Sequence, residues 1–149
     1  MARINYYGIE DAIRSVLAAD SDLAGVTITV EEELSPARGN VVGIYLDSRS
    51  APNELQGLSA GQRTRFHVTF SIWCWHFGVG RDWRVPMQQR DDLLGKVEIV
   101  LMKNRTLNDT VTMSWLTGGE FMSGPDPTGN QFMSGAEIKL TADVAASTV

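Results

Sequence analysis

One stretch in the middle of the chain, residues 65–77, constrains the fold more than any other. It reads RFHVTFSIWCWHF and holds the only cysteine and both histidines. Apolar side chains recur at every second position, which is the period of a β-strand. One face would carry Phe66, Val68, Phe70, Ile72 and Cys74, and the other His67, Thr69, Ser71, Trp73 and Trp75. Large apolar side chains on both faces predict a central strand covered on both sides, or covered on one side by a neighbouring subunit.

Composition is that of an ordinary globular domain. The 149 residues are 43% hydrophobic and 21% charged, which predicts one domain over residues 1–149. The single cysteine cannot form an internal disulfide, and no zinc-type spacing surrounds it. No apolar run has the length of a membrane span, and the first residues, MARINYYGIED, lack the apolar core of a signal peptide. We therefore expect a soluble protein from a reducing compartment, with no cofactor, no metal and no membrane partner.

The charge balance bears on nucleic-acid partners. There are 18 acidic and 13 basic residues, a net charge of -5, and the bases form no stripe or block. Tight binding to a phosphate backbone needs clustered Lys and Arg, so stable DNA affinity is not expected. An acidic surface can instead face DNA across water and repel it, which would let DNA pass without binding.

Two segments have the periodicity of amphipathic helices. They cover residues 9–19 and residues 86–103, the second with Pro86 near its first position. The solvent-facing side of the second helix is expected to carry Arg90, Asp92, Lys96 and Lys103.

Alternating patterns predict four strands besides the central one. They cover residues 26–31, 41–47, 110–116 and 136–144. A turn-forming sequence between the first two predicts that they form a hairpin. The order of elements predicts an α+β fold, with a mainly antiparallel sheet of about five strands and two helices packed on one face.

Two long loop arms, residues 48–62 and 117–134, carry apolar side chains that one small core does not easily accommodate. The first arm contains Pro52, Leu55 and Leu58, and the second contains the pairs Phe121-Met122 and Phe132-Met133. Exposed apolar residues on glycine-rich arms are expected to dock onto another protein. In the alternative interpretation each arm folds back over its own domain.

Candidate catalytic groups are few. Cys74 and His76 share a face of the central strand, but a reactive cysteine needs an electropositive, partly open setting, whereas Cys74 projects with the apolar set. Packing as a small buried hydrophobe is the favoured role for this cysteine. In the run Glu31-Glu32-Glu33 only Glu31 and Glu33 could cooperate, and solvated strand-end charge is the simpler explanation. An enzyme is therefore not expected. The alternative is a small-molecule-binding or enzymatic domain with a pocket near Cys74 and His76.

The segments RTRFHVTFSIWCWHFG, RDDLLGKVEIVLMKN and TVTMSWLTGGEF, in this order, resemble the tail terminator (tail completion) proteins of long-tailed bacteriophages. This neck family is related in fold to the tail-to-head joining proteins. The resemblance extends from the first helix to Phe121 and includes no catalytic motif. It implies a homohexameric ring that caps the finished tail tube, stops polymerisation and meets the head connector or an adaptor protein, with DNA passing through the channel. The protein would be part of the virion, assembled in the host cytoplasm.

The resemblance also suggests roles for particular residues. Contact with the tail tube is expected around Pro52, Leu55 and Leu58. Subunit contacts are expected at Trp73, Trp75, Phe121, Met122, Phe132 and Met133. Charge alone suggests that Glu31 and Glu33 face the lumen. The stretch 122–133 departs from the family pattern, and a connector-side adaptor or a minor tail subunit is a further alternative within virion assembly.

Overall fold

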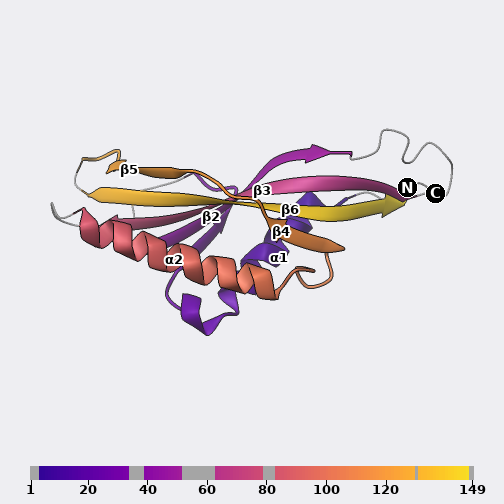
Figure 1. The fold of residues 1–149 in the computed structure, drawn as a ribbon, viewed down its shortest axis with the longest axis horizontal. Helices are drawn as coiled ribbons and strands as arrows, with labels where there is room; N and C mark the ends of the chain where they lie inside the picture. The colour runs from indigo at the N-terminus through magenta and orange to yellow at the C-terminus, as the bar shows by residue number, and fades with distance from the viewer. Residues whose placement is uncertain (1–3, 34–38, 52–62, 79–82, 130, 148–149) are drawn as a thin grey trace.

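A computed structural model describes residues 4–33, 39–51, 63–78, 83–129 and 131–147. Its strands form one six-stranded sheet in the order β1-β2-β3-β6-β4, with β5 also paired to β6. Both α-helices pack against the same face of this sheet (Figure 1), so the predicted α+β fold is confirmed. In chain order, the elements are α1 (Tyr6–Ala18), η1 (Ser21–Leu23), β1 (Thr27–Val30), β2 (Gly39–Ser50), β3 (Arg63–Gly78), α2 (Arg84–Lys103), β4 (Met113–Leu116), β5 (Phe121–Pro125) and β6 (Phe132–Ser147).

The centre of the sheet is the antiparallel pair β3 and β6. Each strand has 16 residues, and they pair along their whole length, from Arg63 opposite Ser147 to Gly78 opposite Phe132. At about 3.4 Å per residue such strands are on the order of 50 Å long. The 20 residues of α2 span only about 30 Å. The sheet therefore extends beyond the helices, as Figure 1 shows.

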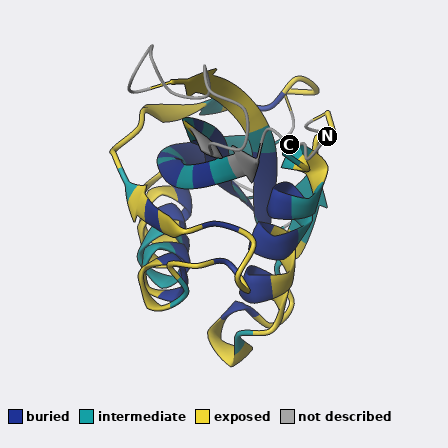
Figure 2. Cartoon of the chain, turned by 90° about the vertical axis from the view of Figure 1, so that its right-hand side faces the viewer, coloured by how far each residue is buried: buried dark blue, intermediate teal, exposed yellow. Residues whose placement is uncertain are grey.

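The core lies between the helices and the sheet. Val68, Phe70, Ile72 and Cys74 of β3 are fully buried on the helix side, as the alternation predicts. The end view in Figure 2 shows the buried residues gathered there. The predicted apolar stripes of the helices are also in this core, with Ile9, Ile13, Val16, Leu17, Leu93, Val97, Val100 and Leu101 buried.

The predicted hairpin between residues 26–31 and 41–47 is wrong. β1 and β2 pair in parallel, from Thr27 opposite Val41 to Val30 opposite Ile44. Glu31 has a φ of 53° and its N–H donates to the Ile44 carbonyl at 2.9 Å. Alternation decides which face a side chain occupies, but it is the same for parallel and antiparallel strands. The sequence pattern therefore could not distinguish the two directions.

The two predicted arms have different outcomes. Residues 48–50 continue β2, which pairs with β3 past an irregularity between Leu46 and Ser48. The rest of the first arm, residues 52–62, lies outside the described residues. In the second arm, β5 and the start of β6 pair antiparallel, from Phe121 opposite Ala136 to Pro125 opposite Phe132. The second arm thus folds back on its own domain, as the alternative interpretation expected.

β4 and β5 form one interrupted strand along the edge of β6. Between them, the Thr117 N–H donates to the Lys139 carbonyl at 2.8 Å and the Lys139 N–H donates to the Gly118 carbonyl at 2.6 Å. The five steps from 116 to 121 oppose only the four from 140 to 136, which defines a β-bulge. Gly118 has a φ of 101° and supplies the left-handed conformation that this bulge requires.

Aromatic rings lie across two glycines on the face of the sheet opposite the helices. A Cβ on Gly135 would lie 2.5 Å from the Trp75 ring, and a Cβ on Gly43 would lie 2.9 Å from the Tyr45 ring. Both distances are far below van der Waals contact. The rings can therefore pack flat on the neighbouring backbone only because these positions lack a side chain.

We predict that Gly135→Ala displaces the Trp75 ring and lowers the free energy of unfolding by roughly 1–3 kcal/mol, the usual cost of overpacking. Urea unfolding followed by tryptophan fluorescence measures both effects. Gly124→Ala in β5 is the matched control, because a Cβ there has nothing within 4 Å. Equal stability of the two variants would contradict the prediction.

Candidate functional site

The outer face, by which we mean the face of the sheet opposite the helices, carries an aromatic ladder on β3. Trp73 and Trp75 stack with ring centroids 5.2 Å apart and an interplanar angle of 16°, and Phe77 follows 6.4 Å from Trp75. Val41 and Met133 pack against this ladder. Trp75 and Phe77 are only 6% and 3% exposed, whereas Trp73 is half-buried. The chain thus covers most of the ladder by itself, and Trp73 is its solvent-facing member.

Farther along β3 the outer face is polar. Cross-strand hydrogen bonds join Thr69 to Thr141 at 3.2 Å and Ser71 to Glu137. Ion pairs join Arg65 to Asp143 and, at 3.7 Å, Lys139 to Asp47. The basic side chains of Arg65 and Lys139 each face an acidic side chain. Among the side chains that the structure describes, the outer face therefore offers no concentrated positive charge for a phosphate backbone.

We call four exposed apolar residues of β5 and the start of α2 the β5 patch: Phe121 on the helix side of the sheet, Met122 on the outer face, and Trp83 and Val85. Phe121 is 65% exposed and Trp83 is 62% exposed. The Trp83 ring stacks on Phe132 with centroids 5.4 Å apart, which ties the start of α2 to the start of β6. Exposed aromatic and methionine side chains of this kind are typical of protein interfaces.

Arg90 holds the β5–β6 hairpin against α2. Its guanidinium donates to the Ser134 hydroxyl at 2.9 Å, pairs with Asp91 at 2.9 Å, and lies 4.9 Å from the centre of the Phe121 ring. Arg90 is 7% exposed, so its predicted place on the solvent-facing side of α2 is wrong. The reason is tertiary: β5 covers this part of the helix, which the helical pattern alone does not reveal.

A second exposed apolar group lies at the β4 edge, and the sequence analysis did not identify it. It comprises Met113 and Trp115, which lie on the outer face opposite Asp143 and Thr141, and Ile99 and Met102 of α2 on the helix side. The His67 ring meets Trp115 edge-on at 5.3 Å. The spacing of Met113 and Trp115 was visible in the sequence, but nothing there showed that this strand forms an edge.

The remaining predicted site residues occupy different parts of the molecule. Pro52, Leu55 and Leu58 lie outside the described residues. Phe132 and Met133 are half-buried, and Met133 packs on the aromatic ladder. Glu33 is exposed, whereas the Glu31 carboxylate accepts a hydrogen bond from the Leu46 N–H at 2.6 Å. The lumen-facing and subunit-contact roles of these residues stay predictions.

Glu10, which is buried, and Glu31, which is exposed, form a carboxyl pair between α1 and the end of β1. Glu10 is 4% exposed and hydrogen-bonds the Glu31 carboxylate. Burial, this hydrogen bond and the Glu31 charge raise the pKa of Glu10 from its ordinary 4.5 to about 8. At neutral pH a proton on Glu10 therefore joins the two carboxyl groups.

Cys74 and His76 do not form a reactive pair. Cys74 is fully buried, and burial, with a smaller contribution from Glu98, raises the pKa of its thiol. His76 is hydrogen-bonded through Nδ1 to Asn40 Oδ1 at 2.7 Å, and burial lowers its pKa. A nucleophilic cysteine needs a lowered pKa and access to solvent. Cys74 therefore packs as a core residue.

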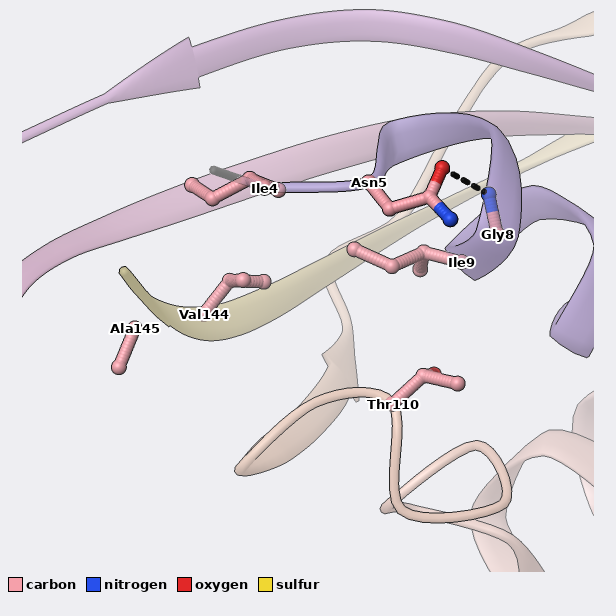
Figure 3. Close-up of a pocket in the computed structure, with 7 residues that line it drawn as sticks. All are labelled: Ile4, Asn5, Gly8, Ile9, Thr110, Val144 and Ala145. Carbon is pink, nitrogen blue, oxygen red and sulfur yellow. Dashed lines mark hydrogen bonds between the residues drawn. The ribbon is translucent and has the colours of Figure 1, made fainter. Parts of the chain in front are cut away.

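Figure 3 shows a cavity of about 270 Å³ where the start of α1 approaches the end of β6. Among the described residues, its lining contains no charged side chain, and the Asn5 side chain caps α1 by accepting from the Gly8 N–H at 3.0 Å. The cavity is lined by Ile4, Asn5, Gly8, Ile9, Thr110, Val144 and Ala145. It therefore lies apart from Cys74 and His76 and offers few groups for acid–base chemistry.

The described residues contain neither a metal-binding cluster nor a helix that could span a membrane. In this part of the chain no three His, Cys, Asp or Glu side chains are grouped so as to hold a metal ion. No helix there is long and apolar enough to cross a membrane.

The fold is similar to that of two solved structures. One is the sheath/tube terminator of an extracellular contractile injection system, PVC, in the extended state: identity is 13%, the TM-score is 0.51, and the match covers 95% of this chain and 56% of that chain. The other is a chain of the virion of a native gene transfer agent (GTA) particle, with 13% identity, a TM-score of 0.44, and coverage of 95% and 99%. No protein-family model matches the sequence, and no curated protein does. The first likeness shows a shared fold, and this chain spans little more than half of the terminator chain.

We predict that Cys74→Ala lowers the free energy of unfolding by about 1 kcal/mol, because it removes the buried thiol group and leaves a small cavity. Assembly into higher-order species should be unchanged. Cys74→Ser should cost more, since it buries a hydroxyl group. Urea unfolding and light scattering measure these effects. If Cys74→Ala were as stable as the wild type but no longer assembled, the alternative of a functional pocket near Cys74 would be favoured instead.

We predict that Glu10→Gln makes stability less dependent on pH. Glu10 has a raised pKa in the folded state, so its contribution is fully present below about pH 4.5 and is lost as pH rises to about 8. A glutamine amide can donate to Glu31 at every pH. The variant should therefore match the wild type near pH 5 and be more stable near pH 8, in urea unfolding at both values. The control is Glu120→Gln at an exposed position, and an unchanging difference between wild type and Glu10→Gln would refute the prediction.

Proposed function

We propose that this chain is a structural protein of a phage-like particle, located at the head-proximal end of the tail tube. It would form a ring there, end tube polymerisation and provide the neck surface for head joining, with DNA passing through the ring. The supporting observation is the fold shared with a sheath/tube terminator over 95% of this chain. Because identity is 13%, the likeness supports the function only through the fold, and the surfaces of the molecule must supply the rest of the argument.

The distribution of exposed apolar groups fits a protein with several protein partners. The β5 patch and the β4 edge lie at separate places on one sheet, and each carries exposed aromatic and methionine side chains. A ring subunit needs at least two different neighbour contacts, because a head-to-tail ring joins unlike patches on each copy. It also needs a surface for the tube and another for the connector. We infer that residues 52–62, which join β2 to β3, supply the tube contact through Pro52, Leu55 and Leu58.

Tail-length control then needs no chemical step. A ring that binds the last ring of the tube, but presents an unlike surface on its far side, removes the site to which the next tube ring would add. DNA passage is favoured by the overall charge of -5, since a lumen without clustered bases does not hold the phosphate backbone. Residues Glu31 and Glu33 remain our candidates for the lumen wall. Virion assembly in the host cytoplasm follows from this role.

The test is to add the purified chain to growing tail tubes assembled from the tube protein of the same particle. We expect rings by negative-stain microscopy, tubes capped at one end, and tubes that stop growing. A variant with residues 52–62 replaced by a Gly-Ser linker of equal length should still form rings but should not cap tubes.

Uncapped tubes that keep growing at saturating wild-type protein would refute the terminator role. Rings that bind the connector complex but not the tube would favour the adaptor alternative.

A further inference from the structure

The described part of the sheet has two open edges, and they are chemically unlike. β1 lies at one end of the strand order, and the β4–β5 strand lies at the other. An open edge presents unpaired backbone N–H and C=O groups, which makes it a natural site for pairing with another chain. The side chains and charges beside each edge decide which partner that edge can pair with.

The β4 edge is apolar and basic. Trp115 and Met113 on β4 are 36% and 44% exposed, and Ile99 and Met102 on α2 are 50% and 49% exposed. A hollow of about 190 Å³ separates the end of α2 from β4, with Met102, Arg105, Trp115 and Leu116 in its lining. Lys103 and Arg105 are both exposed beside it. The nearest acid along this strand, Glu120, lies beyond the bulge toward β5.

The β1 edge is a groove bordered by acids. The groove, about 420 Å³ in volume, runs between α1, the segment after η1, and β1. Its apolar lining consists of Ala18, Leu23, Ala24, Val26 and Ile28. Glu31, Glu32 and Glu33 follow β1 directly and are exposed. Arg14 also lines the groove, but it pairs with Asp11.

The two edges present their charges at the same height along the strands. The Glu31 carboxylate accepts from the Leu46 N–H, which places the acids beside Leu46. Backbone pairing across the sheet then joins Leu46 to Phe70, Phe70 to Leu140, and Leu140 to Leu116 on β4. Leu116 lines the hollow beside Arg105. A neighbouring copy set beside this one without a shift along the strands would therefore bring acids and bases together.

Strand direction is also compatible with such a contact. β1 is parallel to β2, β2 and β6 are both antiparallel to β3, and β4 is antiparallel to β6. β4 therefore runs opposite to β1. β5 runs in the same direction as β4, because it is also antiparallel to β6. Pairing runs from Ile28 through Val42, Cys74 and Ala136 to Phe121, so an unshifted neighbouring copy would present its β1 antiparallel to β5, and the sheet could continue across the contact.

From these observations we propose that a second copy of this chain docks head to tail, with the β4–β5 edge of one copy on the β1 edge of the next. Phe121, which is 65% exposed and lies at the height of Ile28, would enter the groove beside β1, while Lys103 and Arg105 near Leu116 would face Glu32 and Glu33. Contacts between like edges are disfavoured, because they would oppose acids to acids or bases to bases. The inference rests on the proposed ring and specifies which surfaces close it.

The test exchanges the charges of the two edges. Variant A carries Lys103→Glu with Arg105→Glu, and variant B carries Glu32→Lys with Glu33→Lys. Each variant alone opposes like charges at every contact, so we expect self-association to weaken roughly tenfold or more. An equimolar mixture of A and B restores opposite charges at both kinds of contact and should regain association, with the two variants alternating around the ring. Sedimentation velocity and negative-stain microscopy are the measurements, and thermal unfolding verifies that every variant folds.

The control is Lys139→Glu, a charge reversal on the outer face at a side chain that pairs with Asp47 within its own chain, which should associate like the wild type. Rings that form equally well from A, from B and from wild type would overturn the edge pairing and leave the proposed ring intact. Weak association of A or B that mixing does not restore would also overturn it. A wild-type chain that forms no ring, even on tail tubes, would contradict the proposed function itself and the edge pairing with it.

Discussion

The continuous pairing of β3 with β6 is the interaction on which the rest of the structure depends. These strands pair over their full 16 residues; β2 and then β1 are added beside β3, and β4 and β5 are added beside β6. Their inward side chains form the floor of the core, on which both helices pack. Their outward side chains form the aromatic ladder and the polar cross-strand pairs. Such pairing joins segments far apart in the chain, which is the kind of non-local contact associated with slower folding.

Alternation in the sequence predicted which residues enter the core, and the helical stripes predicted both helices. These signals are reliable because burial on one face requires a matching period. Strand direction was not predictable in the same way: β1 pairs in parallel with β2 although its pattern suited a hairpin equally well. Arg90 shows the same limit on a helix. A charged residue at an exposed-looking position is buried because β5, distant in sequence, covers it.

The candidate site was predicted in part. Phe121 and Met122 are exposed at the end of the sheet, and Trp73 meets solvent on the outer face, so these residues are accessible to a partner. Trp75 is instead covered by its own chain, because Gly135 leaves room for its ring. The apolar group at the β4 edge was missed. An edge is defined by the absence of a neighbouring strand, and no local pattern in the sequence encodes that absence.

The sheet is longer than the helices that cover it, and this difference separates two kinds of evolutionary constraint. The core occupies the stretch of sheet beneath the helices, whereas the start of β3 and the end of β6 project beyond them (Figure 1). Substitutions at sites that share no contacts usually have additive effects on stability. The projecting ends can therefore accumulate changes that suit a new partner while the core stays intact. Two proteins with this fold could meet quite different assemblies and still share the same central pair of strands.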